Sequence, residues 1–325
     1  MFTFVRFVNL AFVVLVLFGT SNAYGQAATQ VEKFREFNQT IREFASAMRA
    51  SKTEPSSGSI SLEDFVEREF ARMAFATRED VVALSSNSSE RYAVLDALGL
   101  RAFYSISEGN AIEFEQYAFR VDAKGGLRRN DIGSVYGTLI SARLFDRAQI
   151  WHAKLNSAAR ESFPQIVDPT LPNVGRTVWV AHRTDNVLTR REFHQRQGAQ
   201  VVVVASPICH FSVAAMESIA ANTQLSKRLL PMTDWIVPPE QRLSFEKLQQ
   251  WNREHANVQL ALTHRKSDWS ELNEWDTPQF YFLVNGTIIR RVTGWPKGGN
   301  VAAVTAALDE IERRVARQSN EQKID

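Results

Sequence analysis

The segment VVVVASPICHFSVAAM, residues 201–216, contains the only cysteine of the chain, Cys209. Four valines precede it and a stretch of helical spacing follows it, so we expect Cys209 where a strand meets the start of a helix. Unpaired backbone N–H groups and the positive end of the helix dipole favour a thiolate there. We therefore expect a lowered pKa and a sulfur that is nucleophilic near neutral pH. The alternative is a buried, inert thiol.

Two neighbours complete the candidate catalytic set. His210 follows the cysteine directly and, when protonated, would favour the thiolate; the alternative is a polar surface residue. Ser212 stands three positions after Cys209, where a dithiol enzyme carries its second cysteine. A serine hydroxyl cannot form a disulfide, so a mixed disulfide at Cys209 would need an outside thiol to release it.

The histidines indicate no metal site. None of the six is spaced as a helical i, i+4 pair, and Cys209 with His264 would supply at most two ligands. The sequence also contains no glycine-rich phosphate loop. We therefore expect neither a metal nor another cofactor.

Residues 1–23 are typical of an export signal. Arg6 is followed by an uncharged apolar stretch at 7–18, and the small residues Ser21 and Ala23 suggest cleavage after Ala23. We expect an exported protein, in the periplasm of a bacterium; an uncleaved signal would instead tether the chain to a membrane. Oxidising compartments favour paired cysteines, so a single cysteine there excludes an internal disulfide.

Composition and pattern predict two domains. With 38 basic and 36 acidic residues, the net charge of +2 in 325 residues gives no reason to expect a nucleic-acid partner. Helical spacing dominates residues 28–160, beginning with apolar positions three and four apart in 28–50 and a helix start at Ser61. Proline-rich residues 161–175 predict a linker. Strands and helices alternate in 176–320, which predicts an α/β fold after an all-α domain.

The order of elements in 176–320 resembles the thioredoxin superfamily. A strand leads to Cys209 at a helix start, further strands and helices follow, then Thr277-Pro278, an Asn285-Gly286 hairpin and a closing helix. The resemblance implies a thioredoxin-like fold, with CHFS at the place of the family's Cys-x-x-Cys and Pro278 as its cis-proline. It also implies that the backbone of Thr277 pairs with an extended client peptide.

Two further patterns concern partners. SDWSELNEW, residues 267–275, has helical spacing, and Trp269 and Trp275 could form an apolar wall for a client; the alternative is packing against the sheet. Residues 92–119 and 136–155 weakly resemble tetratricopeptide repeats, with a plain helical bundle as the alternative. The helical domain is therefore expected to hold a protein partner.

Two functions fit these observations. The first is monothiol exchange, in which Cys209 forms mixed disulfides with client proteins or glutathione. The second is a redox-inactive thioredoxin-fold adaptor that only presents a client-binding surface. Ser212 and the absence of an acidic residue in the strand before Cys209 favour the second. The position of the single cysteine favours the first, and the reactivity of Cys209 discriminates between them.

Overall fold

The computed structural model describes residues 31–48, 60–73, 88–155, 161–171, 174–239 and 243–321. The export signal expected at 1–23 lies outside these residues. The chain divides into two compact units, Met1–Leu139 and Ile140–Asp325. Within the described ranges, no helix combines the length and the apolar character needed to cross a bilayer.

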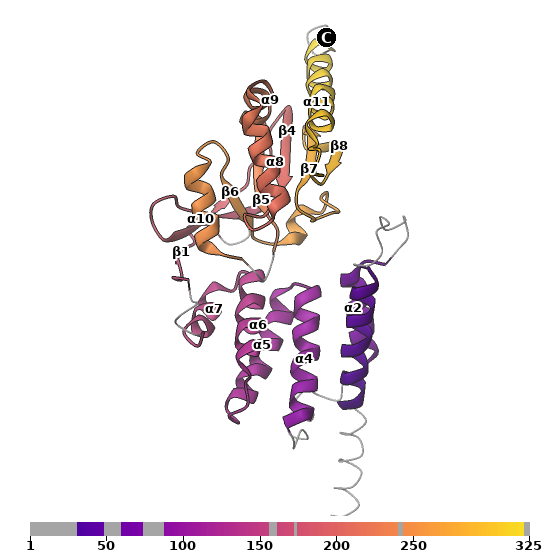
Figure 1. The fold of residues 1–325 in the computed structure, drawn as a ribbon, viewed down its shortest axis with the longest axis vertical. Helices are drawn as coiled ribbons and strands as arrows, with labels where there is room; N and C mark the ends of the chain where they lie inside the picture. The colour runs from indigo at the N-terminus through magenta and orange to yellow at the C-terminus, as the bar shows by residue number, and fades with distance from the viewer. Residues whose placement is uncertain are drawn as a thin grey trace, which may run out of the picture. The chain divides into compact units, whose positions relative to one another are not determined.

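The first unit is helical, as the sequence predicts. Among the described residues its helices are 31–48, α2 (Leu62–Arg72), α4 (Ser88–Tyr104), α5 (Glu108–Asp122) and α6, which begins at Arg129 and ends at Ser141 in the second unit (Figure 1). Spacings of three and four bury Phe34, Phe37 and Ile41 on one face of helix 31–48. The ring of Phe37 meets that of Phe70 edge-on at 5.5 Å. The α2 helix begins after Ser61, whose hydroxyl accepts the N–H of Asp64 at 3.0 Å.

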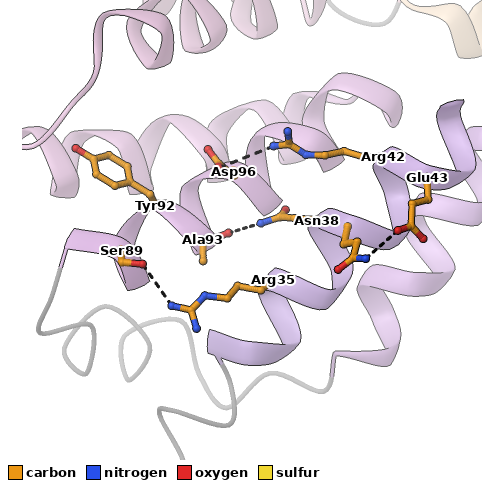
Figure 2. A pocket seen from close by; sticks show the side chains of 9 residues that line it. Arg35, Asn38, Arg42, Glu43, Ser89, Tyr92, Ala93 and Asp96 are labelled. Carbon is orange, nitrogen blue, oxygen red and sulfur yellow. Dashed lines mark hydrogen bonds and ion pairs between the residues drawn. The ribbon is translucent and has the colours of Figure 1, made fainter.

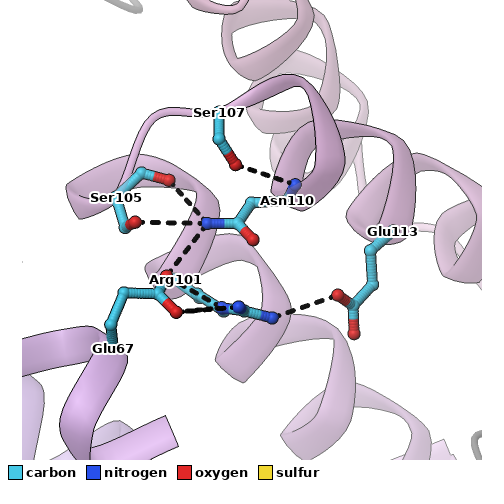
Figure 3. A network of polar contacts seen from close by, with 6 residues as sticks. All are labelled: Glu67, Arg101, Ser105, Ser107, Asn110 and Glu113. Atoms are coloured by element: carbon cyan, nitrogen blue, oxygen red, sulfur yellow. Dashed lines mark hydrogen bonds and ion pairs between the residues drawn. The ribbon is translucent and has the colours of Figure 1, made fainter. Parts of the chain in front are cut away.

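A polar network ties α2, α4 and α5 together (Figure 3). Arg101 donates to both carboxylate oxygens of Glu67, at 3.0 and 2.7 Å, and to Glu113 at 3.1 Å. Asn110 donates to Glu67 at 3.0 Å and to the carbonyl of Ser105 at 2.8 Å. Burial raises the pKa of Glu67, but these hydrogen bonds and the charge of Arg101 outweigh it and hold the pKa below its usual value.

The second unit is built on a mixed sheet. The eight strands found among the described residues follow the order β1-β3-β2-β6-β5-β4-β7-β8. Strands β4, β5 and β6 are parallel to one another, whereas β7 is antiparallel to both β4 and β8. Their bounds are Gln165–Val167, Thr177–Ala181, Val187–Glu192, Ala199–Val204, Thr233–Val237, Leu260–Thr263, Gln279–Val284 and Thr287–Thr293 for β1 to β8. This is an α/β arrangement after a helical unit.

Side chains cover both faces of this sheet. On one face, Trp269 and Leu272 join the buried strand residues Val202, Val204 and Tyr281 in one apolar cluster. On the other face, Trp235 of β5 lies 6.1 Å from the ring of Trp251 in α10. The helices of this unit are α7 (Phe145–His152), α8 (His210–Ala221), α9 (Thr223–Leu229), α10 (Phe245–Glu254) and α11 (Val301–Glu321), and the short 3₁₀ turns are η2 (Leu230–Met232) and η3 (Lys266–Trp269) (Figure 1).

The division between the units lies earlier than the linker expected at 161–175. Helix α7 belongs to the second unit because the ring of Phe145 packs edge-on against Trp179 of β2 at 4.9 Å. In addition, Arg143 donates to the carbonyl of Thr263 at the end of β6, at 2.8 Å. Part of the expected linker forms β1, which pairs with β3.

The prediction of a helix at 267–275 is wrong for the residues after the first turn. Only η3 is helical there, and residues 272–276 carry no regular structure. Apolar side chains in this stretch pack onto the sheet, where Trp269 and Leu272 are buried. The backbone N–H of Glu274 donates to the hydroxyl of Tyr281 at 3.0 Å rather than to a helical carbonyl.

Candidate active site

Cys209 lies where the sequence predicts, at the start of a helix. It is the N-cap of α8, with extended backbone angles, and its carbonyl accepts the N–H of Val213 at 3.1 Å. Its own N–H donates to the carbonyl of Ser206, also at 3.1 Å, which turns the chain from the end of β4 into the helix. The side chain of Cys209 is therefore attached at the end of α8 whose first N–H groups have no helical carbonyl partner.

Strand register brings Thr277 to the cysteine. Val204 at the end of β4 pairs with Gln279 at the start of β7, so the residues just beyond these two ends are neighbours. The sulfur of Cys209 lies 3.4 Å from the carbonyl oxygen of Thr277. The peptide bond between Thr277 and Pro278 is cis, the isomer expected from the sequence. Three of the expected site residues, Cys209, Thr277 and Pro278, thus lie together.

Ser212 also faces the cysteine. Its side chain is fully buried, and its hydroxyl oxygen accepts the backbone N–H of Ser206 at 3.3 Å. The hydroxyl hydrogen is then available to the sulfur of Cys209, and a side-chain hydrogen bond with Ser212 stabilises the thiolate. The hydroxyl can therefore support a charged sulfur but cannot form a disulfide with it.

The surroundings of Cys209 favour its charged form. Burial raises the pKa of the thiol, because the thiolate loses hydration. Hydrogen bonds with the side chain of Thr277, with the backbone and hydroxyl of Ser212 and with the backbone of Phe211 lower it. Together they outweigh burial, so the pKa of Cys209 lies below its ordinary value. The arrangement stabilises a nucleophilic thiolate.

Two predicted site residues lie differently from this group. His210 is exposed, and its ring lies 3.8 Å from that of Phe211, tilted by 40°. Trp275 is half-buried and packs edge-on against Trp269 at 6.5 Å, on the apolar cluster of the sheet. Neither His210 nor Trp275 has a hydrogen bond to Cys209 within the described part of the chain. Their roles in catalysis and client binding stay predictions.

Polar contacts that no sequence pattern predicted hold the segment before Thr277; we name them the Glu274 bracket. The hydroxyl of Tyr281 donates to the carbonyl of Glu274 at 2.6 Å, and Gln279 donates to the carboxylate of Glu274 at 2.8 Å. Arg291 on β8 forms an ion pair with the same carboxylate. Alternating polar residues at 279 and 281, on a strand buried throughout, were the available signal.

Two exposed apolar side chains close to Cys209 in the sequence were not predicted either. Ile208 and Phe211 flank Cys209 in sequence and are 46% and 45% exposed. Exposed apolar side chains of this kind are common in surfaces that contact other proteins. Only their position next to Cys209 in the sequence indicated this role.

No metal centre is apparent at the cysteine. Among the described residues, no group of three or more His, Cys, Asp or Glu side chains is placed to hold an ion. The ring of His264, considered as a partner for Cys209, instead accepts the indole N–H of Trp179 at 3.1 Å.

The helical unit contains a separate hollow (Figure 2). It has a volume of about 750 Å³ and lies between helix 31–48 and the start of α4. Arg35 pairs with Glu32 at 3.0 Å and donates to Ser89, and Arg42 lies 3.9 Å from Asp96. Its positive charges are therefore already matched by carboxylates.

Comparisons of the chain with protein-family models, with curated proteins and with solved structures found no match.

Proposed function

We propose that this protein carries out thiol–disulfide exchange with one thiol, at Cys209 of a thioredoxin-like domain. The observation that carries the proposal is the position of the sulfur at the N-cap of α8, where its pKa is lowered. The sulfur lies 3.4 Å from the carbonyl oxygen of Thr277, and Ser212 takes the place of a second thiol. The order of strands and helices in 176–320 and the cis bond before Pro278 support the fold assignment.

The reaction follows from the groups present. The thiolate of Cys209 attacks one sulfur of a client disulfide or of a glutathione mixed disulfide. A bond forms between the two sulfurs, the original S–S bond breaks, and the other sulfur leaves as a thiolate. Because Ser212 cannot attack the new disulfide, a thiol from glutathione or from another protein must do so and restore Cys209.

The environment of the sulfur suits the first step. When protonated, the thiol can donate to the carbonyl of Thr277; when charged, it accepts from the Ser212 hydroxyl and from the N–H groups of the helix start. Ile208 and Phe211, which are exposed and close to Cys209 in the sequence, would contact the client. The proposal includes export through residues 1–23 and a helical unit that holds the client protein.

The test is the rate at which the full chain reacts with an aromatic disulfide, measured against pH. We expect a reaction in the folded protein with a midpoint below the free cysteine value of about 8.5. Incubation with oxidised glutathione should give one mixed disulfide, visible by mass spectrometry, which added reduced glutathione removes.

The single cysteine makes the control unambiguous. Cys209→Ser leaves no thiol in the chain, so it should lose all exchange activity and keep its circular dichroism spectrum. Exchange that survives in this variant would overturn the proposal. So would a thiol that reacts only after unfolding, and that result would favour the redox-inactive adaptor.

A further inference from the structure

The β7–β8 hairpin and α11 enclose a groove rich in arginine, which we name the hairpin–helix groove. It has a volume of about 710 Å³. The lining residues are Val284, Asn285, Thr287 and Ile289 from the hairpin and Glu310, Arg313, Arg314, Arg317 and Gln318 from the helix. Three arginines face one glutamate, so the groove has an excess of positive charge.

Two of these arginines have no acidic partner within the described residues. Glu310 is already shared by Arg314 at 3.1 Å and Arg290 at 3.4 Å. Arg313 donates to the backbone carbonyl of Asp309 at 3.1 Å, and no ion pair forms at Arg317 in the described part of the chain. Both side chains are exposed. The arginines in the hollow of the helical unit, by contrast, have carboxylate partners.

The walls of the groove are fixed against each other. Asn285 at the hairpin turn donates to the side chain of Gln318 on α11 at 3.1 Å. The side-chain oxygen of Asn285 accepts a hydrogen bond from the backbone N–H of Gly198 at 2.7 Å. The turn is therefore held in place against the helix, and the groove is preformed rather than dependent on a ligand.

We propose that the hairpin–helix groove binds an acidic peptide segment of a partner protein. A guanidinium fork matches a carboxylate in shape and charge. Arg313 and Arg317 lie four residues apart on α11, which is about 6 Å along the helix axis. Alternate side chains of an extended peptide repeat at about 6.6 Å, so carboxylates at positions i and i+2 would meet the two arginines together.

Size and lining favour a peptide over a small inorganic anion. The groove is far larger than a single phosphate, and the partly exposed Ile289 gives it an apolar portion that a peptide side chain can cover. Among the described residues, β8 is also the edge strand of the sheet. The site lies at the far end of β7 from Cys209, roughly 17 Å away by the rise of a strand, and does not depend on thiol chemistry.

The test measures fluorescence anisotropy of a rhodamine-labelled Glu-Thr-Glu-Thr-Glu peptide with the full chain at low salt. We expect saturable binding that weakens as salt is added. The double variant Arg313→Gln/Arg317→Gln should bind about tenfold more weakly or worse, since two charge-assisted hydrogen-bond partners are lost. Both positions are exposed, so the fold should persist.

The matched control removes the same charge elsewhere in this unit. Arg191→Gln/Arg253→Gln changes two exposed arginines on β3 and α10 and should leave binding unchanged. Equal loss in both double variants would overturn the proposal, as would no binding at all. Displacement of the peptide by inorganic phosphate at equal concentration would show a small-anion site and also overturn it. Equal binding of the permuted peptide Glu-Glu-Thr-Thr-Glu would refute the alternate spacing.

Discussion

Replacing Ser212 with alanine should weaken the thiolate at Cys209 in a way that the pH dependence of exchange can resolve. The hydroxyl is fully buried and forms a hydrogen bond that favours the charged sulfur. A hydrogen bond to a charged group contributes about 1.5–3 kcal/mol, and we take about 1 kcal/mol because the sulfur is half-exposed and a diffuse acceptor. The thiolate fraction of Ser212→Ala at a pH below the midpoint should then fall about fivefold.

The rate of exchange should change less than the thiolate fraction. A thiolate of higher pKa is intrinsically more nucleophilic, with a Brønsted coefficient of about 0.4–0.5. Exchange with an aromatic disulfide should therefore be about two- to threefold slower in Ser212→Ala below the midpoint, and about twofold faster at a pH where both proteins are fully ionised. The two rate curves should cross, which simple damage to the site would not produce.

The assay is stopped-flow reaction with 2,2′-dipyridyl disulfide across the titration of the thiol, with circular dichroism as a check on the fold. Loss of the hydrogen bond from Ser206 should cost about 1 kcal/mol of stability, which is not enough to unfold a typical domain. Ser218→Ala is the matched control, because Ser218 lies on the same helix and donates to the carbonyl of Ala214 at 2.7 Å. Superimposable curves for wild type and Ser212→Ala would show that the hydroxyl does not act on the sulfur.

Two further predictions concern the helical unit. Arg101→Met should lower the free energy of unfolding by about 2–3 kcal/mol, measured by urea titration, because it leaves the buried Glu113 without its guanidinium partner. Arg72→Met removes a guanidinium that is itself 65% exposed, 2.8 Å from Glu69, and should cost less than about 1 kcal/mol; equal losses would contradict the argument. The folded-state pKa of Glu67 is lowered, so its contribution to stability is present above the unfolded value of about 4.3 and is lost as the pH falls through the folded value. The stability of Glu67→Gln should therefore fall less steeply than that of wild type on acidification, and an unchanged slope would refute this assignment.

The sequence predicted those elements whose buried residues recur at a regular local spacing or whose turn needs a particular residue type. The repeat of three and four in 31–48 corresponds directly to the buried Phe34, Phe37 and Ile41. The Asn285-Gly286 pair predicted a hairpin because both residues must adopt positive φ, and their φ values are 48° and 79°. In each case one local property decides the structure.

Strands β1 and β3 were not predicted from the sequence, because they form through pairing with distant segments rather than through a local pattern. Only Leu188 is fully buried in β3, and Arg190 and Arg191 obscure the alternation. Arg190 is held by an ion pair to Asp168, at 3.0 Å, just beyond β1. No spacing within either segment indicates that partner.

The same limit applies to the candidate site. The place of Cys209 at a helix start could be predicted because the strand before it and the helix after it have local patterns. The proximity of Thr277 was inferred only from the order of elements, and the register of β4 with β7 brings the two together. The Glu274 bracket consists of contacts from Gln279 and Tyr281 on β7 to Glu274. No fixed spacing in the sequence predicts these contacts.

Ser212 separates two tasks that a second cysteine would perform together. A thiol at this position would stabilise the attacking thiolate and later resolve the mixed disulfide, whereas the hydroxyl can do only the first. Under the proposed exchange, the lifetime of the mixed disulfide is then set by how easily an outside thiol reaches the sulfur. A client that covers the exposed Ile208 and Phe211, close to Cys209 in the sequence, would hinder that approach. Such a site holds its client covalently until a reductant enters, which fits capture of a partner better than rapid turnover.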